Sequence, residues 1–182
     1  MLMLTETQRG VLGGMLAGLA ITLFALGFAI VEPPQALLPE LASHSALVQV
    51  LRWEVLLIVW LAVNIAVLAR HRFFTPADMD GSGLAEGTSK AKLLQSILQN
   101  TLEQSVLAFS AHLIWAAAMP RDWQAAVPAA AILFFLGRAL FWRGYSHGAP
   151  ARALGFALTF YPTVVMLVLV LGRLAWGLVA RD

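Results

Sequence analysis

Near the C-terminal end of the chain, the polar stretch RALFWRGYSHGAPAR lies between two long apolar segments. Arg138 and Tyr145 in this stretch are seven residues apart, so on a helix they share one face. An arginine can hold a carboxylate through two parallel hydrogen bonds, and Arg138 lies deeper in the apolar segment than its neighbours, which favours an anion site. For Arg143 and His147 we expect the alternative, in which the side chains snorkel to the lipid headgroups.

The same stretch contains the break between two helices. Gly148 and Pro150 end one helix, and proline is favoured in the first turn of the next. Arg152 then falls in that first turn, where its guanidinium and the helix N-terminus both contribute positive potential. The pattern therefore predicts an anion-binding site that includes Arg138 and Arg152.

A second polar set lies in the segment KAKLLQSILQNTLEQSVLAFSAHLIW. Its polar side chains recur at intervals of three, four or seven residues, which places them on one helical stripe: Lys92, Ser96, Asn100, Glu103 and Ser110. Such residues often only join helices by hydrogen bonds, and we expect this of Ser96 and Ser110. A carboxylate at membrane depth needs a cation or a proton, so we expect an arginine of a neighbouring helix near Glu103. Asn100 is equally consistent with a site and with an interhelical contact.

Three other polar positions have simpler explanations. Arg52 and Glu54 are consistent with an interfacial ion pair or with snorkelling. His112 lies roughly opposite the polar stripe and is interpreted as a packing or interface residue. Arg70 belongs to a basic group at the end of the second apolar segment, which is typical of a cytoplasmic anchor.

The connection between the second and third apolar segments partly matches a calcium-binding loop. The matching positions are Asp78, Asp80, Ser82 and Gly83. Position twelve of that pattern is Ser89, where a bidentate glutamate is required. We therefore expect a solvated, flexible loop and no metal site.

The composition places these groups in a membrane. Of the 182 residues, 60% are hydrophobic and 12% are charged, and the mean hydropathy is +0.78, far above that of a soluble domain. Windows of about 20 apolar residues fit at five places: residues 10–31, 47–70, 92–119, 125–145 and 152–178. The prediction is an all-α integral membrane protein with five spans. The chain has no cysteine, so any thiol chemistry must use a thiol that a ligand brings.

The distribution of Lys and Arg predicts the orientation of the spans. The N-terminal segment has Arg9, the second connection is the richest in Lys and Arg, and the fourth has Arg143 and Arg152, whereas the first connection has neither residue type. Under the positive-inside rule, the N-terminus and the Arg138 to Arg152 stretch face the cytoplasm. Scattered arginines with only two lysines indicate membrane topology, and we expect no nucleic-acid partner.

These motifs together resemble the MAPEG family (membrane-associated proteins in eicosanoid and glutathione metabolism), from about Leu56 to the C-terminus. Residues 69–72 resemble an arginine-rich turn of that family, and Asn100 with Glu103 match its Asn-x-x-Glu motif. The most specific match is Arg-x-x-x-x-x-Gly-Tyr followed by an arginine seven residues later; its positions here are Arg138, Gly144, Tyr145 and Arg152. The sequence departs from the glutathione-using members at Ser96, where they have arginine, at Phe141, where they have tyrosine, and at Gln104.

The resemblance implies a bacterial-type member with a four-helix bundle, residues 47–182, preceded by an extra transmembrane helix and external connection, residues 1–46. It also implies a homotrimer that binds glutathione between subunits near the cytosolic side. The contacts it implies are made by Arg70, Asn100, Glu103, Arg138, Tyr145 and Arg152, and the catalytic groups are Arg152, which would stabilise the thiolate, and Tyr145.

The resulting hypothesis is a glutathione transferase or peroxidase of a bacterial inner membrane that acts on lipophilic substrates entering from membrane lipids. One alternative is a non-catalytic lipid-binding protein of the same fold. The other is a small proton-coupled transporter, with Glu103 as proton site and Arg138 as its counter-ion.

Overall fold

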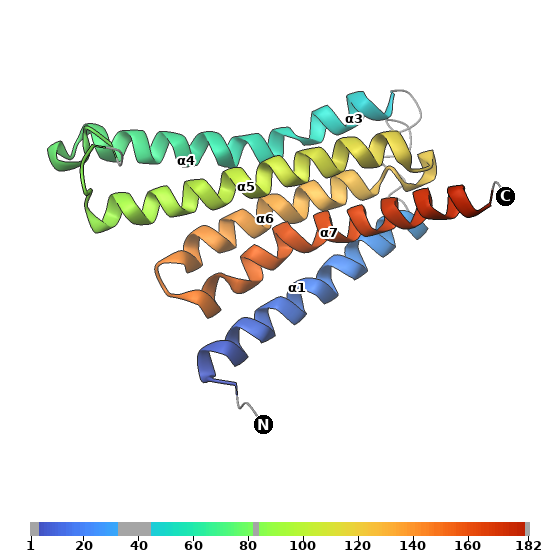
Figure 1. The fold of residues 1–182 in the computed structure, drawn as a ribbon, viewed down its shortest axis with the longest axis horizontal. Helices are drawn as coiled ribbons and strands as arrows, with labels where there is room; N and C mark the ends of the chain where they lie inside the picture. Colours follow the sequence, from blue (N-terminus) through green and yellow to red (C-terminus); the bar gives the residue numbers. More distant parts are fainter. Residues whose placement is uncertain (1–3, 33–44, 82–83, 181–182) are drawn as a thin grey trace.

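The computed structural model describes residues 4–32, 45–81 and 84–180, and the part of the chain it describes is helical, without strands. The elements in chain order are α1 (Glu6–Val31), α3 (Ala46–Trp53), α4 (Val55–Phe73), η1 (Pro76–Asp78), α5 (Ser89–Ala118), η2 (Arg121–Trp123), α6 (Ala126–Tyr145) and α7 (Ala149–Val179). Successive long helices run in opposite directions, so α1 begins at one end of the bundle and α7 ends at the other (Figure 1). The predicted all-α architecture is confirmed.

Within the described residues, four helical segments are long and apolar enough to cross a membrane: Glu6–Val31, Ala46–Phe73, Arg121–Tyr145 and Ala149–Val179. Helix α5 is 30 residues long and packs between them, but its polar stripe makes it less apolar than the other four. All five predicted spans therefore correspond to long helical segments, and each boundary lies within a few residues of its expected place.

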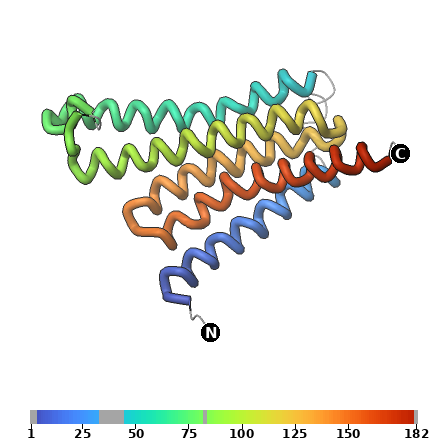
Figure 2. The backbone as a smooth tube through the Cα atoms, viewed as in Figure 1, coloured from blue at the N-terminus to red at the C-terminus, as the bar shows by residue number. Residues whose placement is uncertain are grey.

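The helices lie side by side in the order α4, α5, α6, α7 and α1, as the ribbon and the backbone tube both show (Figures 1 and 2). Helix α7 contacts α1, α5 and α6, and glycines allow the close approach of α6 and α7. A Cβ atom added to Gly155 would lie 2.7 Å from the carbonyl oxygen of Gly137 and 2.8 Å from Cα of Phe141. Only glycine can be accommodated at such a distance from backbone atoms.

A buried pair of ionisable side chains joins the start of α4 to α5. Nδ1 of His112 lies 2.5 Å from Oε1 of Glu54, and the two residues are 1% and 3% exposed. Glu54 lies at the junction of α3 and α4, where the chain turns its carboxylate inward. The expectation that Glu54 forms an interfacial ion pair or snorkels is therefore wrong, because the carboxylate is enclosed and contacts His112.

The connection between α4 and α5 is anchored by Asp78. Its carboxylate accepts hydrogen bonds from the backbone N–H of Thr88 at 2.6 Å and from the Thr88 hydroxyl at 2.7 Å, and it lies 2.9 Å from Nε2 of His71. Asp78 is only 2% exposed, so the expected solvated loop is wrong for this residue. Ser82 and Gly83 of the calcium-like pattern lie outside the described residues.

We expect Gly155→Ala to lower the free energy of unfolding by about 2 kcal/mol, because the added methyl group overlaps backbone atoms of α6. The measurement is thermal or denaturant unfolding in detergent, followed by circular dichroism. Gly172→Ala on the same helix is the matched control, since a Cβ there meets no atom within 4 Å. Alanine has the higher helix propensity, so this control should be as stable as the wild type or more so. Equal effects of the two substitutions would contradict the close packing of α6 on α7.

The pKa of Asp78 is held below its ordinary value of 3.8, first by the backbone hydrogen bond from Thr88 and then by the Thr88 hydroxyl, while burial acts in the opposite direction and His71 lowers it further. A lowered folded-state pKa means that the carboxylate stabilises the fold above about pH 4, and that this stabilisation is lost as the pH falls through the lower value. Unfolding measured from pH 7 to pH 3 should show Asp78→Asn less stable than the wild type at neutral pH. The difference in free energy of unfolding between the two proteins should narrow below about pH 4. The exposed neighbour Asp80 provides the control Asp80→Asn, for which a similar narrowing would refute the assignment.

Candidate functional site

Arg138 is enclosed in the interior of the bundle, with 2% of its surface exposed. From α6, its Nη1 donates to Oδ1 of Asn100 on α5 at 2.9 Å, and its Nη2 donates to the hydroxyl of Thr159 on α7 at 2.8 Å. The Thr159 hydroxyl in turn donates to the carbonyl oxygen of Phe156 at 2.8 Å. One guanidinium therefore connects three helices.

Aromatic rings complete the surroundings of this guanidinium. Its central carbon lies 4.3 Å from the ring centroid of Phe141 and 5.7 Å from that of Phe134, distances at which a cation is attracted to the ring face. Among the described residues, no carboxylate forms an ion pair with Arg138, and its Nε has no hydrogen-bond partner. The positive charge is thus held by dipoles and rings, without a counter-ion from the described part of the chain.

Arg152 lies in the first turn of α7, as the sequence predicted. The helix begins after Gly148, whose φ of 95° is the left-handed conformation that glycine adopts without strain. The Arg152 guanidinium carbon lies 4.3 Å from the ring centroid of Tyr145, and the side chain is only partly buried. No acidic side chain in the described ranges pairs with Arg152, so its charge is available to a ligand.

A pocket of about 370 Å³ opens beside this arginine. Four helices contribute its lining residues: Val11, Met15, Asn100, Phe141, Tyr145, Ala149, Arg152, Ala153 and Phe156. Asn100, Tyr145 and Arg152 supply the polar groups, and the other lining residues are apolar. The pocket can therefore accept a ligand that combines an anionic group with an apolar portion. The structure brings these three predicted residues to one place, with Arg138 bonded to Asn100 behind them.

Two of the other predicted site residues lie elsewhere on the single chain. Arg70 is exposed and lines a separate pocket of about 420 Å³ with His71 and Lys90. Glu103 is exposed on α5 and accepts a hydrogen bond from Gln99 at 2.9 Å. Asn100 and Glu103 lie about 60° apart around α5 and one turn apart along it, but only Asn100 lines the pocket beside Arg152.

The expected arginine partner of Glu103 is not found in the described part of the chain. Arg138 donates to Asn100 instead, so the Glu103 to Arg138 pair required by the transporter hypothesis does not form. The two serines of the stripe also differ from expectation: Ser96 donates to the carbonyl of Lys92, and Ser110 to that of Val106. Each hydroxyl donates within its own helix, and neither has a hydrogen bond to another helix within the described residues of this chain.

Sequence reasoning missed Thr159 and the two lining residues from α1, Val11 and Met15. Thr159 is seven residues after Arg152, so the two share one face of a mostly apolar helix, and this spacing could have marked Thr159 as part of the site. In the structure its hydroxyl is buried. No comparable signal existed for Val11 and Met15, because apolar residues in an apolar helix do not show which face of the helix lines a site.

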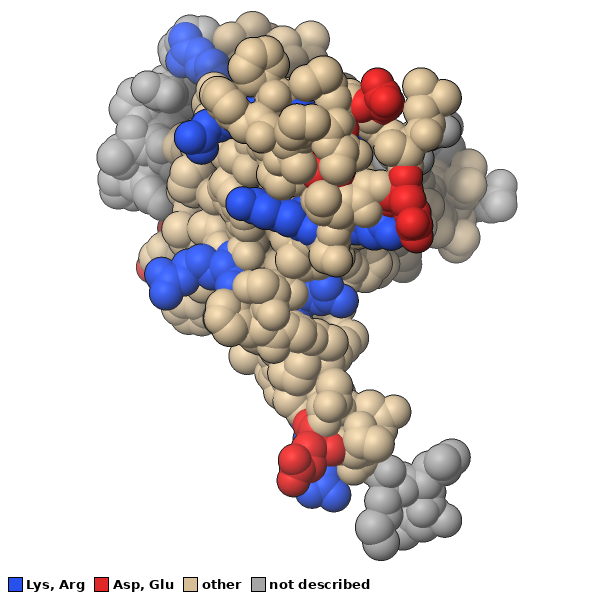
Figure 3. Space-filling model, turned by 90° about the vertical axis from the view of Figure 1, so that its left-hand side faces the viewer, with Lys and Arg blue, Asp and Glu red and all other residues tan. Residues whose placement is uncertain are grey.

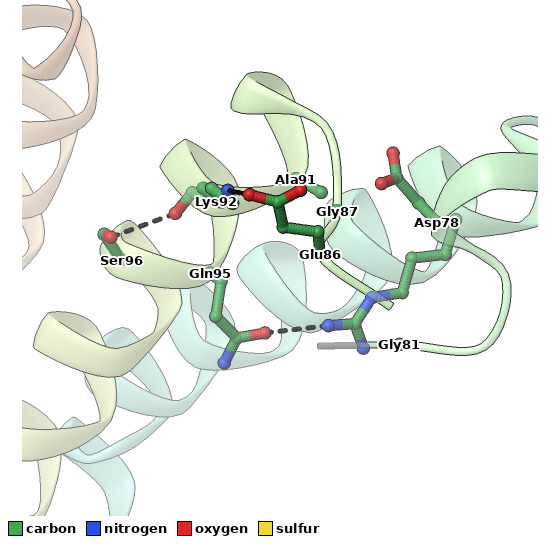
Figure 4. A pocket seen from close by; sticks show the side chains of 9 residues that line it. Asp78, Gly81, Glu86, Gly87, Ala91, Lys92, Gln95 and Ser96 are labelled. Carbon is green, nitrogen blue, oxygen red and sulfur yellow. Dashed lines mark hydrogen bonds and ion pairs between the residues drawn. The ribbon is translucent and has the colours of Figure 1, made fainter. Parts of the chain in front are cut away.

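The end of the bundle that carries the α4–α5 and α6–α7 connections presents Lys and Arg side chains at several separate places (Figure 3). A third pocket, of about 240 Å³, lies there, and Figure 4 shows its polar contacts. Arg72 donates to Gln95 at 3.0 Å, and Nζ of Lys92 lies 3.8 Å from Glu86. Because these cations have partners within the pocket, it is less suited to an anion than the pocket beside Arg152.

Comparison with known proteins identifies the family of the chain. A model of the MAPEG family matches residues 50–172, which is well over half of the chain. A search of curated proteins and a search of solved structures found no match. The matched segment includes Asn100, Arg138, Tyr145 and Arg152, and it begins after α1. The chain therefore belongs to the MAPEG family.

Proposed function

We propose that this protein is a membrane-bound glutathione transferase or peroxidase that acts on lipophilic electrophiles. Membership in the MAPEG family supports a membrane role related to glutathione or to lipid metabolism. The observation that carries the finer assignment is the guanidinium of Arg152, which pairs with no carboxylate of the described residues and lines a pocket together with Tyr145 and Asn100.

Arg152 is suited to activating a thiol. A cation beside the sulfur of bound glutathione favours the charged form, so it lowers the pKa of that thiol and increases the thiolate fraction at neutral pH. In the transferase reaction the thiolate sulfur forms a bond to the electrophilic carbon, and the leaving group departs with the bonding electron pair. Tyr145, whose ring lies against Arg152, can donate a hydrogen bond to the sulfur or to the leaving group.

Asn100 and Arg138 are suited to positioning the tripeptide. Arg138 donates to Oδ1 of Asn100, which fixes the amide and leaves its Nδ2 as a donor toward the pocket. Glutathione has two carboxylates that can accept such a hydrogen bond. We therefore assign Asn100 to ligand binding and Arg138 to holding Asn100 in place.

The assembly and orientation that support this function are part of the proposal. Glu103 and Gln99 are exposed on the surface of a helix in the bundle, where contact with lipid would be costly. A homotrimer would cover them and could bring Arg70 and Glu103 of neighbouring subunits to the glutathione. The positive-inside pattern supports an inner-membrane protein whose site faces the cytoplasm.

A second candidate function is non-catalytic lipid binding, which two observations favour. Most residues that line the pocket are apolar, and Phe141 occupies a position where the glutathione-using members have a tyrosine. A protein of this kind would bind apolar ligands in the same pocket without glutathione.

The thiolate assignment predicts the effect of Arg152→Met. Wild-type protein in detergent should show the ultraviolet absorbance of a thiolate when glutathione is added at neutral pH. The variant should lose that signal by about tenfold or more, because an adjacent cation shifts such a pKa by roughly 1–3 units. Arg143→Met removes an exposed arginine from the preceding helix and should keep the signal. Equal thiolate absorbance in Arg152→Met and in the wild type would overturn the assignment.

The positioning role predicts that Arg138 and Asn100 act as one unit. Asn100→Ala and Arg138→Met should each weaken glutathione binding by about tenfold, measured by calorimetric titration, and the double variant should be little weaker than either single one. Additive losses would show that Arg138 contributes independently of Asn100. Near-ultraviolet circular dichroism separates a loss of binding from a loss of fold.

A further inference from the structure

Helix α1 forms one side of the Arg152 pocket, although it lies outside the segment that matches the family model. Val11 and Met15 of α1 line the pocket together with Tyr145 of α6 and Arg152 of α7. The site of this chain therefore includes a wall that the four-helix bundle alone does not supply.

Close packing fixes the position of that wall. Gly10, Gly14 and Gly18 recur at every fourth residue of α1 and lie against α7. A Cβ atom added to Gly10 would lie 2.9 Å from Cβ of Pro150, and one added to Gly14 would lie 2.9 Å from Cβ of Ala153. Pro150 and Ala153 flank Arg152 in the sequence, so the α1 contact is set directly beside the arginine.

The two lining residues each follow a contact glycine. Val11 and Met15 come one position after Gly10 and Gly14, so their side chains are turned by about 100° from the contact line with α7. This turn directs them along the edge of the α1–α7 contact, where the pocket opens.

The chemistry of the two walls differs. Asn100, Tyr145 and Arg152 offer hydrogen bonds and a positive charge, whereas Val11 and Met15 offer only apolar surface. Methionine is flexible and adapts to apolar groups of varied shape. Met15 is 38% exposed, so this wall continues to the outer surface of α1, where lipid would lie around a membrane-spanning helix.

We propose that α1 is the acceptor-binding element of the site, and that Val11 and Met15 hold the hydrocarbon portion of the electrophile while its reactive atom meets the sulfur near Arg152. This inference rests on the proposed function, because it places the acceptor relative to bound glutathione. The class of acceptor it specifies is an electrophile with an extended or branched hydrocarbon tail that enters from the bilayer along α1.

The test measures binding, with glutathione and S-hexylglutathione as probes of the detergent-solubilised full chain. The quantity compared is the ratio of the two affinities, obtained by calorimetric titration. Each methylene buried on the protein should strengthen binding about three- to fourfold, so burial of about four of the six hexyl carbons should raise the wild-type ratio to roughly 100. Met15→Ser and Val11→Ser should each lower the ratio by about tenfold, and Met15→Leu should keep it.

Leu16→Ser is the matched control, because Leu16 is 58% exposed on α1 and is not among the residues that line the pocket. This control should keep the wild-type ratio. A ratio unchanged in both Met15→Ser and Val11→Ser, with glutathione still bound, would overturn the role of α1 and leave the proposed function standing. A wild-type protein that binds neither probe would overturn the proposed function, and the acceptor role of α1 with it.

Discussion

The arrangement of α5, α6 and α7 depends on the enclosure of one guanidinium. Arg138 is 2% exposed in an apolar bundle, where an unsatisfied charge is prohibitively costly. Asn100, Thr159 and the face of Phe141 must therefore lie around it together. The close approach of α6 and α7 at Gly155 belongs to the same arrangement, because it brings Thr159 within reach of Arg138. The polar interior thus orders the helices around the pocket.

This arrangement separates the tasks of the two arginines. Arg138 uses its hydrogen bonds inside the protein, whereas Arg152 has no carboxylate partner within the described residues and lines the pocket. The charge that orders the bundle and the charge that would meet the ligand are therefore different groups, and Asn100 both bonds Arg138 and lines the pocket with Arg152. Helix α1 adds apolar lining residues to the same pocket, which suits a reaction between an anionic sulfur and an apolar acceptor. This division is the physical basis of the proposed activity.

The sequence predicted the parts of the structure that depend on spacing along one helix. Apolar windows located the five long helical segments, and the Gly148 to Pro150 break correctly placed Arg152 in the first turn of α7. Contacts between helices could not be obtained in this way, because periodicity does not say which helix a side chain meets. Glu54 was therefore misassigned to the interface although it pairs with His112, and Glu103 was expected beside an arginine although it bonds Gln99. Val11 and Met15 had no polar character that could point to the site.

The role of Arg152 is tested most directly by the position of the sulfur atom in a structure of the full chain bound to S-hexylglutathione. We expect the sulfur to lie about 3–4 Å from the guanidinium of Arg152, in the pocket that Asn100 and Tyr145 also line, with the hexyl chain against α1. A sulfur bound at another pocket, or an Arg152 side chain paired with a carboxylate of the protein itself, would contradict it.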